Sequence, residues 1–223
     1  MSLERALGSG ALIAVLVGAM TASVGAQADS STARRPVVPK ALVEAGEYGE
    51  NLYDAAKASD WTGARRRLTA LEAAVKQVTV EKGTGGSEDS LEQNLVALKH
   101  SVAGRQRRET LRLANQITLN VANLTARYAP KIPVQVTRLD FYGRELEIWS
   151  EAGDADRLRA TAEGMRREWE NVRPSVEGRD FAEARKFGAL VTRVERARTP
   201  AADRRLAEAE LEEVDNLEKA FER

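Results

Sequence analysis

Apolar residues recur three and four positions apart through most of this 223-residue chain. They form five clear series, at 42–56, 61–78, 114–128, 139–149 and 158–172. This spacing places an apolar stripe along one face of an α-helix, and a stripe this narrow suits antiparallel packing against other helices. No stretch alternates convincingly with the two-residue period of a half-buried strand. The sequence therefore predicts an all-α helical bundle without a sheet.

Residues that start or interrupt helices fall between these series. Asp60, Asp154, Asp180 and Thr199 stand where helix N-caps belong. Because Gly104 is a weaker break than these, one long bent helix over 88–129 is an open alternative to two helices. We expect eight helices, at 40–58, 60–81, 88–102, 105–129, 134–152, 155–175, 180–198 and 200–222.

The chain also matches itself at a spacing of 93 to 94 residues. Seven identities relate residues 48–78 to 142–172, and six relate 112–128 to 205–221. Shared helical spacing explains the apolar matches, but it does not explain why a Tyr-Gly pair and an N-cap Asp recur in the same order. The pattern predicts an internal duplication.

This duplication defines the expected domains. Two tandem four-helix modules, 40–129 and 134–223, are joined by a Pro-containing connector at 130–133. The sequence leaves open whether the modules form two bundles or one merged core. Gly49 and Gly143 recur at matched positions inside helices, where glycine costs about 1 kcal/mol relative to alanine. We therefore expect close helix–helix approach at both glycines.

The first residues predict export. A short start containing Arg5 precedes an uncharged apolar stretch, and a small-x-small sequence ending at Ala28 follows. This order is typical of a signal peptide, here residues 1–28, which is cleaved after Ala28. An uncleaved membrane anchor is the alternative, but the strongly apolar part, 11–18, is short for a span. Residues 29–39 contain two prolines and no periodicity, so we expect a flexible leader.

Composition excludes several kinds of function. The 34 Lys and Arg residues balance the 34 Asp and Glu residues, which argues against a nucleic-acid binder that works through a positive field. The absence of cysteine excludes disulfides, thiolate nucleophiles and Cys-ligated metal sites. The single histidine, His100, has no carboxylate three or four residues away, so a helical metal pair is absent. We therefore expect no enzyme, no metal and no bound cofactor.

Acidic residues crowd the last expected helix. Hard cations prefer carboxylate oxygens, but the spacing does not resemble an EF-hand. We interpret this helix as carrying a solvated acidic face. Its acidic residues are Glu208, Glu210, Glu212, Glu213, Asp215, Glu218 and Glu222.

A basic strip in the first module is one candidate for a ligand or partner surface. It contains Arg105, Arg108 and Arg112, and it would suit an anionic polymer or lipid headgroup of the cell envelope. The first module carries a formal charge of +2 (13 basic, 11 acidic) and the second −4 (17 basic, 21 acidic). The alternative is a set of solvated helix faces.

A second candidate surface follows the connector. Aromatic, basic and acidic groups are dense around Tyr142, Arg144 and Glu145, and a cleft between the modules would lie here. The alternative is an amphipathic helix with an aromatic packing face and ion pairs one turn apart.

The expected function follows from export, helical architecture and the lack of catalytic motifs. We expect a bacterial protein of the periplasm or extracellular space, with a non-enzymatic binding, adaptor or structural role in the cell envelope. Its expected partner is an envelope protein or an anionic envelope component, and not nucleic acid. The mature chain has no further segment apolar enough to span a membrane. A periplasmic metal- or cofactor-binding bundle is the alternative, and the sequence does not indicate an oligomeric state.

Overall fold

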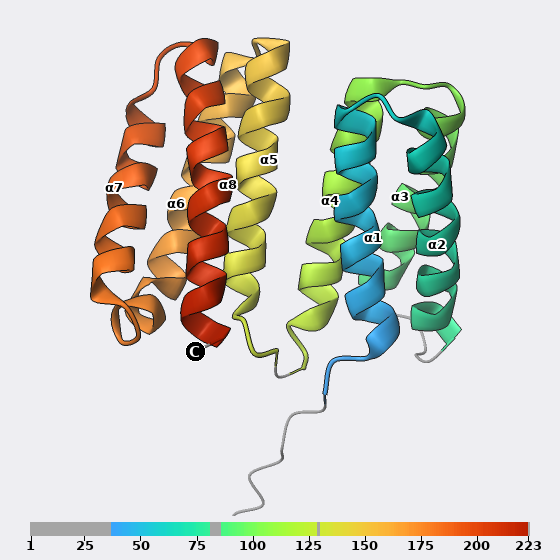
Figure 1. The fold of residues 1–223 in the computed structure, drawn as a ribbon, viewed down its shortest axis with the longest axis horizontal. Coiled ribbons are helices and arrows are strands. Elements are labelled where there is room, and N and C mark those ends of the chain that lie inside the picture. The colour runs from blue at the N-terminus through green and yellow to red at the C-terminus, as the bar shows by residue number, and fades with distance from the viewer. Residues whose placement is uncertain (1–36, 81–85, 129, 223) are drawn as a thin grey trace, which may run out of the picture. The chain divides into compact units, whose positions relative to one another are not determined.

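A computed structural model describes residues 37–80, 86–128 and 130–222 (Figure 1), which belong to one compact unit, Arg35–Arg223. The expected signal peptide, its cleavage site and most of the expected leader lie outside the described residues. All regular structure within them is helical, which confirms the all-α prediction. The helices are α1 (Lys40–Lys57), α2 (Trp61–Val80), α3 (Gly86–Ala103), α4 (Arg107–Thr125), α5 (Val134–Ala152), α6 (Ala155–Glu177), α7 (Phe181–Arg196) and α8 (Pro200–Glu222).

Side chains at the predicted N-caps explain where four of these helices begin. Asp60 Oδ1 accepts from the N–H of Gly63 at 2.9 Å. Asp154 and Asp180 make the equivalent bond at 3.0 Å, and the Thr199 hydroxyl makes it at 3.2 Å. Each bond satisfies a backbone donor that the first helical turn leaves free. The chain also leaves the helix between α3 and α4, where Arg105 has a φ of 50°, so the single helix over 88–129 is wrong.

Removing the cap of α7 is expected to lower stability. Asp180→Ala should reduce the free energy of unfolding by about 1 kcal/mol, because the N–H of Glu183 loses its acceptor. Urea denaturation followed by circular dichroism measures this change. Glu208→Ala, at an exposed position in the middle of α8, is the matched control and should stay within about 0.5 kcal/mol of the parent. Equal effects of the two substitutions would contradict the capping role.

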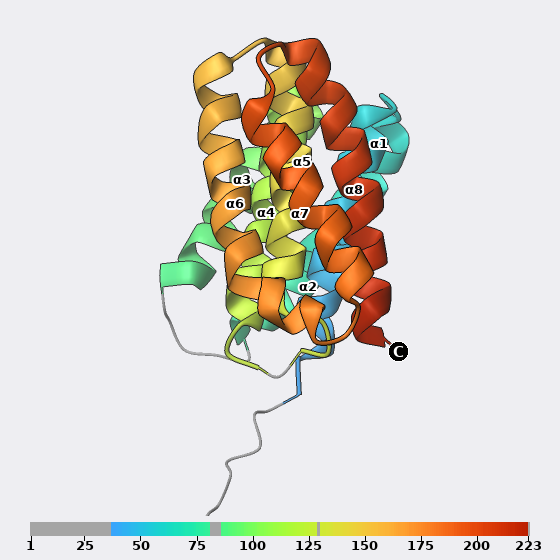
Figure 2. The same cartoon turned by 90° about the vertical axis from the view of Figure 1, so that its left-hand side faces the viewer.

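The helices pack in two groups that meet through α4 and α5. In the first group, α1 contacts α2 and α4, and α3 contacts α2 and α4. In the second, α5 contacts α6 and α8, and α7 lies beside α6 and α8 (Figure 2). Two buried apolar clusters correspond to these groups, and the second contains Trp169 packed on Phe187 with ring centroids 4.9 Å apart. Burial of these apolar stripes supplies the main stabilising term.

The two matched glycines lie at close helix contacts, as expected. A Cβ at Gly49 on α1 would sit 3.2 Å from methyl carbons of Ile117 and Thr118 on α4. A Cβ at Gly143 on α5 would overlap the carboxylate of Glu210 on α8 and lie 2.9 Å from a methyl of Leu211. The contact at Gly143 excludes a side chain, because real Cβ atoms do not approach other atoms so closely, whereas the contact at Gly49 is tight enough that the neighbouring methyl groups would have to shift. Glycine therefore sets the α1–α4 and α5–α8 separations.

A membrane-spanning helix needs about 20 predominantly apolar residues. None of the helices in 37–80, 86–128 and 130–222 meets this requirement.

Candidate functional site

Five ionisable side chains from three helices gather between α1, α5 and α8, and we call them the buried charge cluster. Asp140 and Arg144 lie one turn apart on α5, with Arg144 Nη1 3.1 Å from Asp140 Oδ2. Glu50 of α1 is 3.9 Å from Arg144 Nη2. Glu210 and Glu218 come from one side of α8, since eight residues make slightly more than two helical turns.

Negative groups outnumber positive ones in this cluster. It holds four carboxyl groups, and Arg144 is its one guanidinium. The side chains of Arg144 and Asp140 are only 12% and 16% exposed. Glu210 is fully buried, and neither of its carboxylate oxygens has a hydrogen-bond partner among the described residues. Burial without a partner is costly for a carboxylate, so this arrangement needs either protons or an added cation.

The carboxyl groups of the cluster respond by holding protons more tightly. Burial raises the pKa of Glu210 well above its ordinary value, and the neighbouring Asp140 raises it further. Burial also raises the pKa of Asp140, although Arg144 opposes the shift. The pKa values of Glu50 and Glu218 both rise to about 7. Burial is the main cause, the negative charge of Asp140 raises both values further, and Arg144 opposes the rise. The charge of the cluster therefore changes around neutral pH.

A polar bridge next to the cluster ties α1 to α5. The Tyr53 hydroxyl donates to Glu147 Oε2 at 2.8 Å, and Lys57 Nζ pairs with the other oxygen of the same carboxylate. The Arg144 guanidinium lies 5.3 Å from the centroid of the Tyr53 ring. Burial and Glu147 raise the pKa of Tyr53, so the phenol keeps its proton and donates it. Long side chains thus connect two helices whose Cα atoms do not come within 8 Å.

A groove of about 490 Å³ opens beside the cluster, and we call it the α1–α8 groove. The groove lies between α1 and α8, and no Cα atom of α1 comes within 8 Å of a Cα atom of α8. Most of its wall is apolar, and Glu50 and Glu218 connect it to the cluster. The Lys131 side chain at its edge donates to the Glu222 carbonyl at 2.9 Å. The groove is lined by Val38, Leu42, Val43, Gly46, Glu47, Glu50, Thr118, Val121, Ala122, Thr125, Pro130, Lys131, Ile132, Val134, Thr137, Glu218 and Glu222.

The residues predicted around position 142 point in three directions from α5. Arg144 belongs to the buried charge cluster. Glu145 faces α4, where Asn115 donates to it at 3.0 Å, and it also accepts from Trp149 Nε1 at 2.6 Å. Tyr142 is half-buried, and its ring packs on α6 so closely at Gly164 that a Cβ there would overlap it. One predicted segment therefore serves three contacts, and only Arg144 reaches the groove region.

The predicted basic strip is only partly assembled. Arg112 is held by Glu109 through two hydrogen bonds, which neutralise it. Arg108 and Arg112 line a depression of about 480 Å³ together with Glu145, so three predicted residues do meet there. Arg105 is exposed in the turn before α4 and is not among the residues lining this depression.

Sequence reasoning missed most of the buried charge cluster. The interpretation of α8 as carrying a solvated acidic face is wrong for Glu210, which is fully buried. A sequence signal existed, because Glu210 lies four residues from both Leu206 and Val214 and so falls in the apolar stripe of α8. Glu50 and Glu218 gave no comparable signal, since only tertiary packing brings them together.

His100 is exposed, as expected for a surface histidine. Among the residues whose positions are described, no group of three or more His, Cys, Asp or Glu side chains is arranged to hold a metal ion. No family model, curated protein or solved structure matches this chain.

Proposed function

We propose that the chain consists of two tandem copies of one four-helix unit. The contacts α1–α2, α2–α3, α3–α4 and α1–α4 have counterparts in α5–α6, α6–α7, α7–α8 and α5–α8. The contact of Gly49 with Ile117 also has its counterpart in that of Gly143 with Glu210, at the sequence spacings of 94 and 93. This agreement between sequence repeat and packing supports the duplication.

Matched positions of the two copies also contact each other. Glu50 faces Arg144, and Tyr53 donates to Glu147; both pairs are separated by 94 residues. Such self-matched contacts are typical of two copies related by a twofold axis. The relation is incomplete, because α4 packs against α5 whereas the corresponding helices α8 and α1 bring no Cα atoms within 8 Å of each other. The α1–α8 groove occupies the place of the missing contact.

The proposed function is non-catalytic binding of an amphiphilic organic cation by an exported bacterial protein. The α1–α8 groove offers apolar walls for a hydrocarbon body and carboxylates for an ammonium group. The main support for this proposal is that carboxylates outnumber cationic side chains where the groove meets the buried charge cluster. A bound ammonium would offset the charge that Arg144 leaves uncompensated.

Glu218 is the residue of choice for a test. It lines the groove, and no described side chain forms a hydrogen bond or an ion pair with it. Replacing it by glutamine retains its shape and removes one negative charge. Glu208→Gln, on the exposed side of the same helix, is the matched control.

Calorimetric titration with hexylammonium tests the proposal. We expect binding at pH 8 that weakens about tenfold in Glu218→Gln and is unchanged in Glu208→Gln. Affinity should fall as the pH drops from 8 to 6, because carboxyl groups with a pKa of about 7 then take up protons. Equal binding of neutral hexanol, or equal affinities of the two variants, would overturn the proposal.

A further inference from the structure

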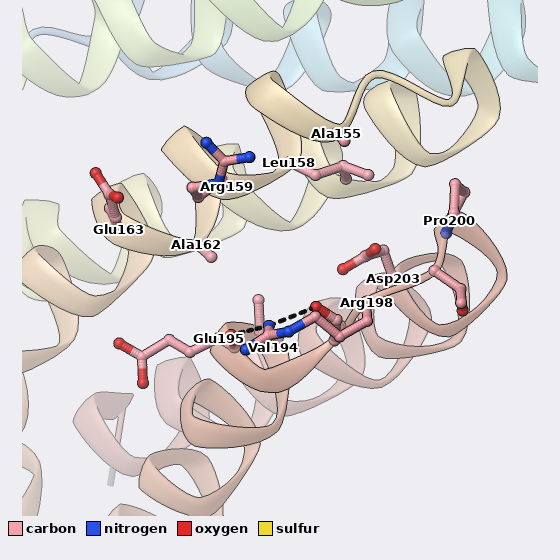
Figure 3. Close-up of a pocket in the computed structure, with 12 residues that line it drawn as sticks. Ala155, Leu158, Arg159, Ala162, Glu163, Val194, Glu195, Arg198, Pro200 and Asp203 are labelled. Atoms are coloured by element: carbon pink, nitrogen blue, oxygen red, sulfur yellow. Dashed lines mark hydrogen bonds between the residues drawn. The ribbon is translucent and has the colours of Figure 1, made fainter.

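A second pocket lies at the other side of the second helical group, between the start of α6 and the turn that joins α7 to α8 (Figure 3). Its volume is about 520 Å³, which is large enough for a small organic molecule. The walls include the buried side chains of Leu158, Ala162 and Val194. Asp203, in the first turn of α8, directs its carboxylate into this space (Figure 3).

Asp203 is an unusual residue to find there, because it is only 7% exposed. Its carboxylate has no hydrogen bond or ion pair with any other described residue. Burial raises its pKa, although a hydrogen bond with its own backbone opposes the shift. An acidic residue in the first turn of a helix normally stabilises the helix from an exposed position. Burial against an apolar wall removes part of the hydration of this carboxylate, and a cation in the pocket would offset that cost.

The arginines at the rim of this pocket do not supply that partner. Arg198 donates from Nη1 to the carbonyls of Glu195 and Ala197, which holds it against the end of α7. Arg159 is 69% exposed and pairs with Asp156 at 3.2 Å. The carboxylate of Glu195, in turn, is held by Arg166. The positive charges near the pocket are therefore engaged with other groups.

The first helical group shows what normally occupies this place. At a spacing of 93 residues, Asp203 corresponds to Thr110 and Val194 corresponds to Ser101. Thr110 is fully buried and donates to Ser101 Oγ at 3.0 Å, which satisfies both hydroxyls across the α3–α4 contact. In the second group a carboxylate replaces the threonine, and a valine replaces the serine. The donor of the pair has become a carboxylate, which only accepts, and the hydroxyl that faced it has been lost.

We propose that the Asp203 pocket is a second binding site, which takes a compact primary ammonium ion with an apolar body. The ammonium donates to the Asp203 carboxylate, and the hydrocarbon part lies against Leu158, Ala162 and Val194. The comparison with Thr110 rests on the proposed duplication, but the pocket and its unpaired carboxylate do not. The site is separate from the α1–α8 groove, with which it shares no lining residue.

Titration of the ¹⁵N-labelled protein with cyclohexylammonium, followed by NMR, tests this assignment. We expect saturable shifts of amides in 155–163 and 194–203. Asp203→Asn should weaken the binding at least tenfold, whereas Asp215→Asn, at an exposed position of α8, should leave it unchanged. Equal shifts with neutral cyclohexanol, or persistence of the binding in Asp203→Asn, would overturn the proposal.

A second variant, Val194→Ser, keeps the Asp203 carboxylate and adds a neighbouring group that competes with the ligand for it. Val194→Ser restores the hydroxyl that Ser101 places beside Thr110 in the first group, and this hydroxyl can donate to Asp203. Its hydrogen bond should compete with cyclohexylammonium and weaken the binding several-fold. Unchanged affinity would contradict the role of the missing hydroxyl. Glu218→Gln should leave the shifts at 155–163 and 194–203 intact, so failure of the groove and failure of this pocket give different spectra.

Discussion

Replacing Arg144 by methionine is expected to lower the free energy of unfolding by about 3–5 kcal/mol at pH 8. Methionine fills a similar volume but removes the one guanidinium that faces Asp140 and Glu50. Two carboxylates then lie next to a fully buried third, Glu210, with no compensating charge in the cluster. Equilibrium denaturation in urea measures the loss.

The pH dependence of this loss distinguishes electrostatics from packing. As the pH falls from 8 toward 5, Glu50 and Glu218, each with a pKa of about 7, take up protons, and the variant is relieved of repulsion. In the parent, protonation of Glu50 removes the charge of one of the carboxylates that face Arg144. The unfolding free energies of the parent and the variant therefore converge at low pH. Arg107→Met, which removes a half-exposed ion pair with Glu151, is the control and should cost at most about 1 kcal/mol. A loss that is the same at pH 5 and pH 8 would show that Arg144 acts through its hydrocarbon stem alone.

Glu210→Ile should have the opposite effect and stabilise the protein by about 1–4 kcal/mol at pH 8. The folded state raises the pKa of Glu210 above its ordinary value near 4.5, so folding disfavours the ionised form. The resulting penalty is absent below pH 4.5 and grows as the pH rises toward the folded-state pKa. Isoleucine removes it, and Ile117 shows that this side chain fits beside a glycine at the matched position.

The gain from Glu210→Ile should therefore be smallest near pH 4 and largest in alkaline solution. Thermal or urea unfolding at several pH values measures it, with Glu208→Gln as the surface control. A gain that does not vary with pH would contradict the assigned protonation. The variant also tests the site, because removal of this acid should reduce affinity for hexylammonium if the buried charge cluster attracts the cation.

The helices were largely predictable from sequence because their signals are local. Apolar spacing predicted the stripes, and Asp60, Asp154 and Asp180 predicted helix starts that the structure confirms. Boundaries differ by up to four residues where no cap is present, as at the end of α4, which the structure places at Thr125. Gly104 predicted the break between α3 and α4 but left one long bent helix as an alternative, and the structure decides for two helices, with a positive φ at Arg105.

The candidate site was less predictable because it depends on which helices meet. Arg144 was chosen for the density of polar groups around it, and it does lie at the centre of the buried charge cluster. Its partner Glu50 comes from a helix 94 residues away, and no local pattern links the two. Under the proposed duplication, Glu210 and Asp203 did carry a signal, since the matched positions of the first module hold the uncharged residues Ile117 and Thr110. Comparison of the copies position by position would have identified both.

The one-sided contact between the two helical groups has a mechanical consequence. Because α4 and α5 pack directly while α1 and α8 stand apart, a rotation about the α4–α5 line changes the width of the α1–α8 groove with little loss of helix packing. Long side chains, such as Tyr53 reaching Glu147, would resist that rotation on the open side. A molecule that spans Glu50 and Glu218 would act as a strut between α1 and α8, and the stiffness of the protein would then depend on its occupancy.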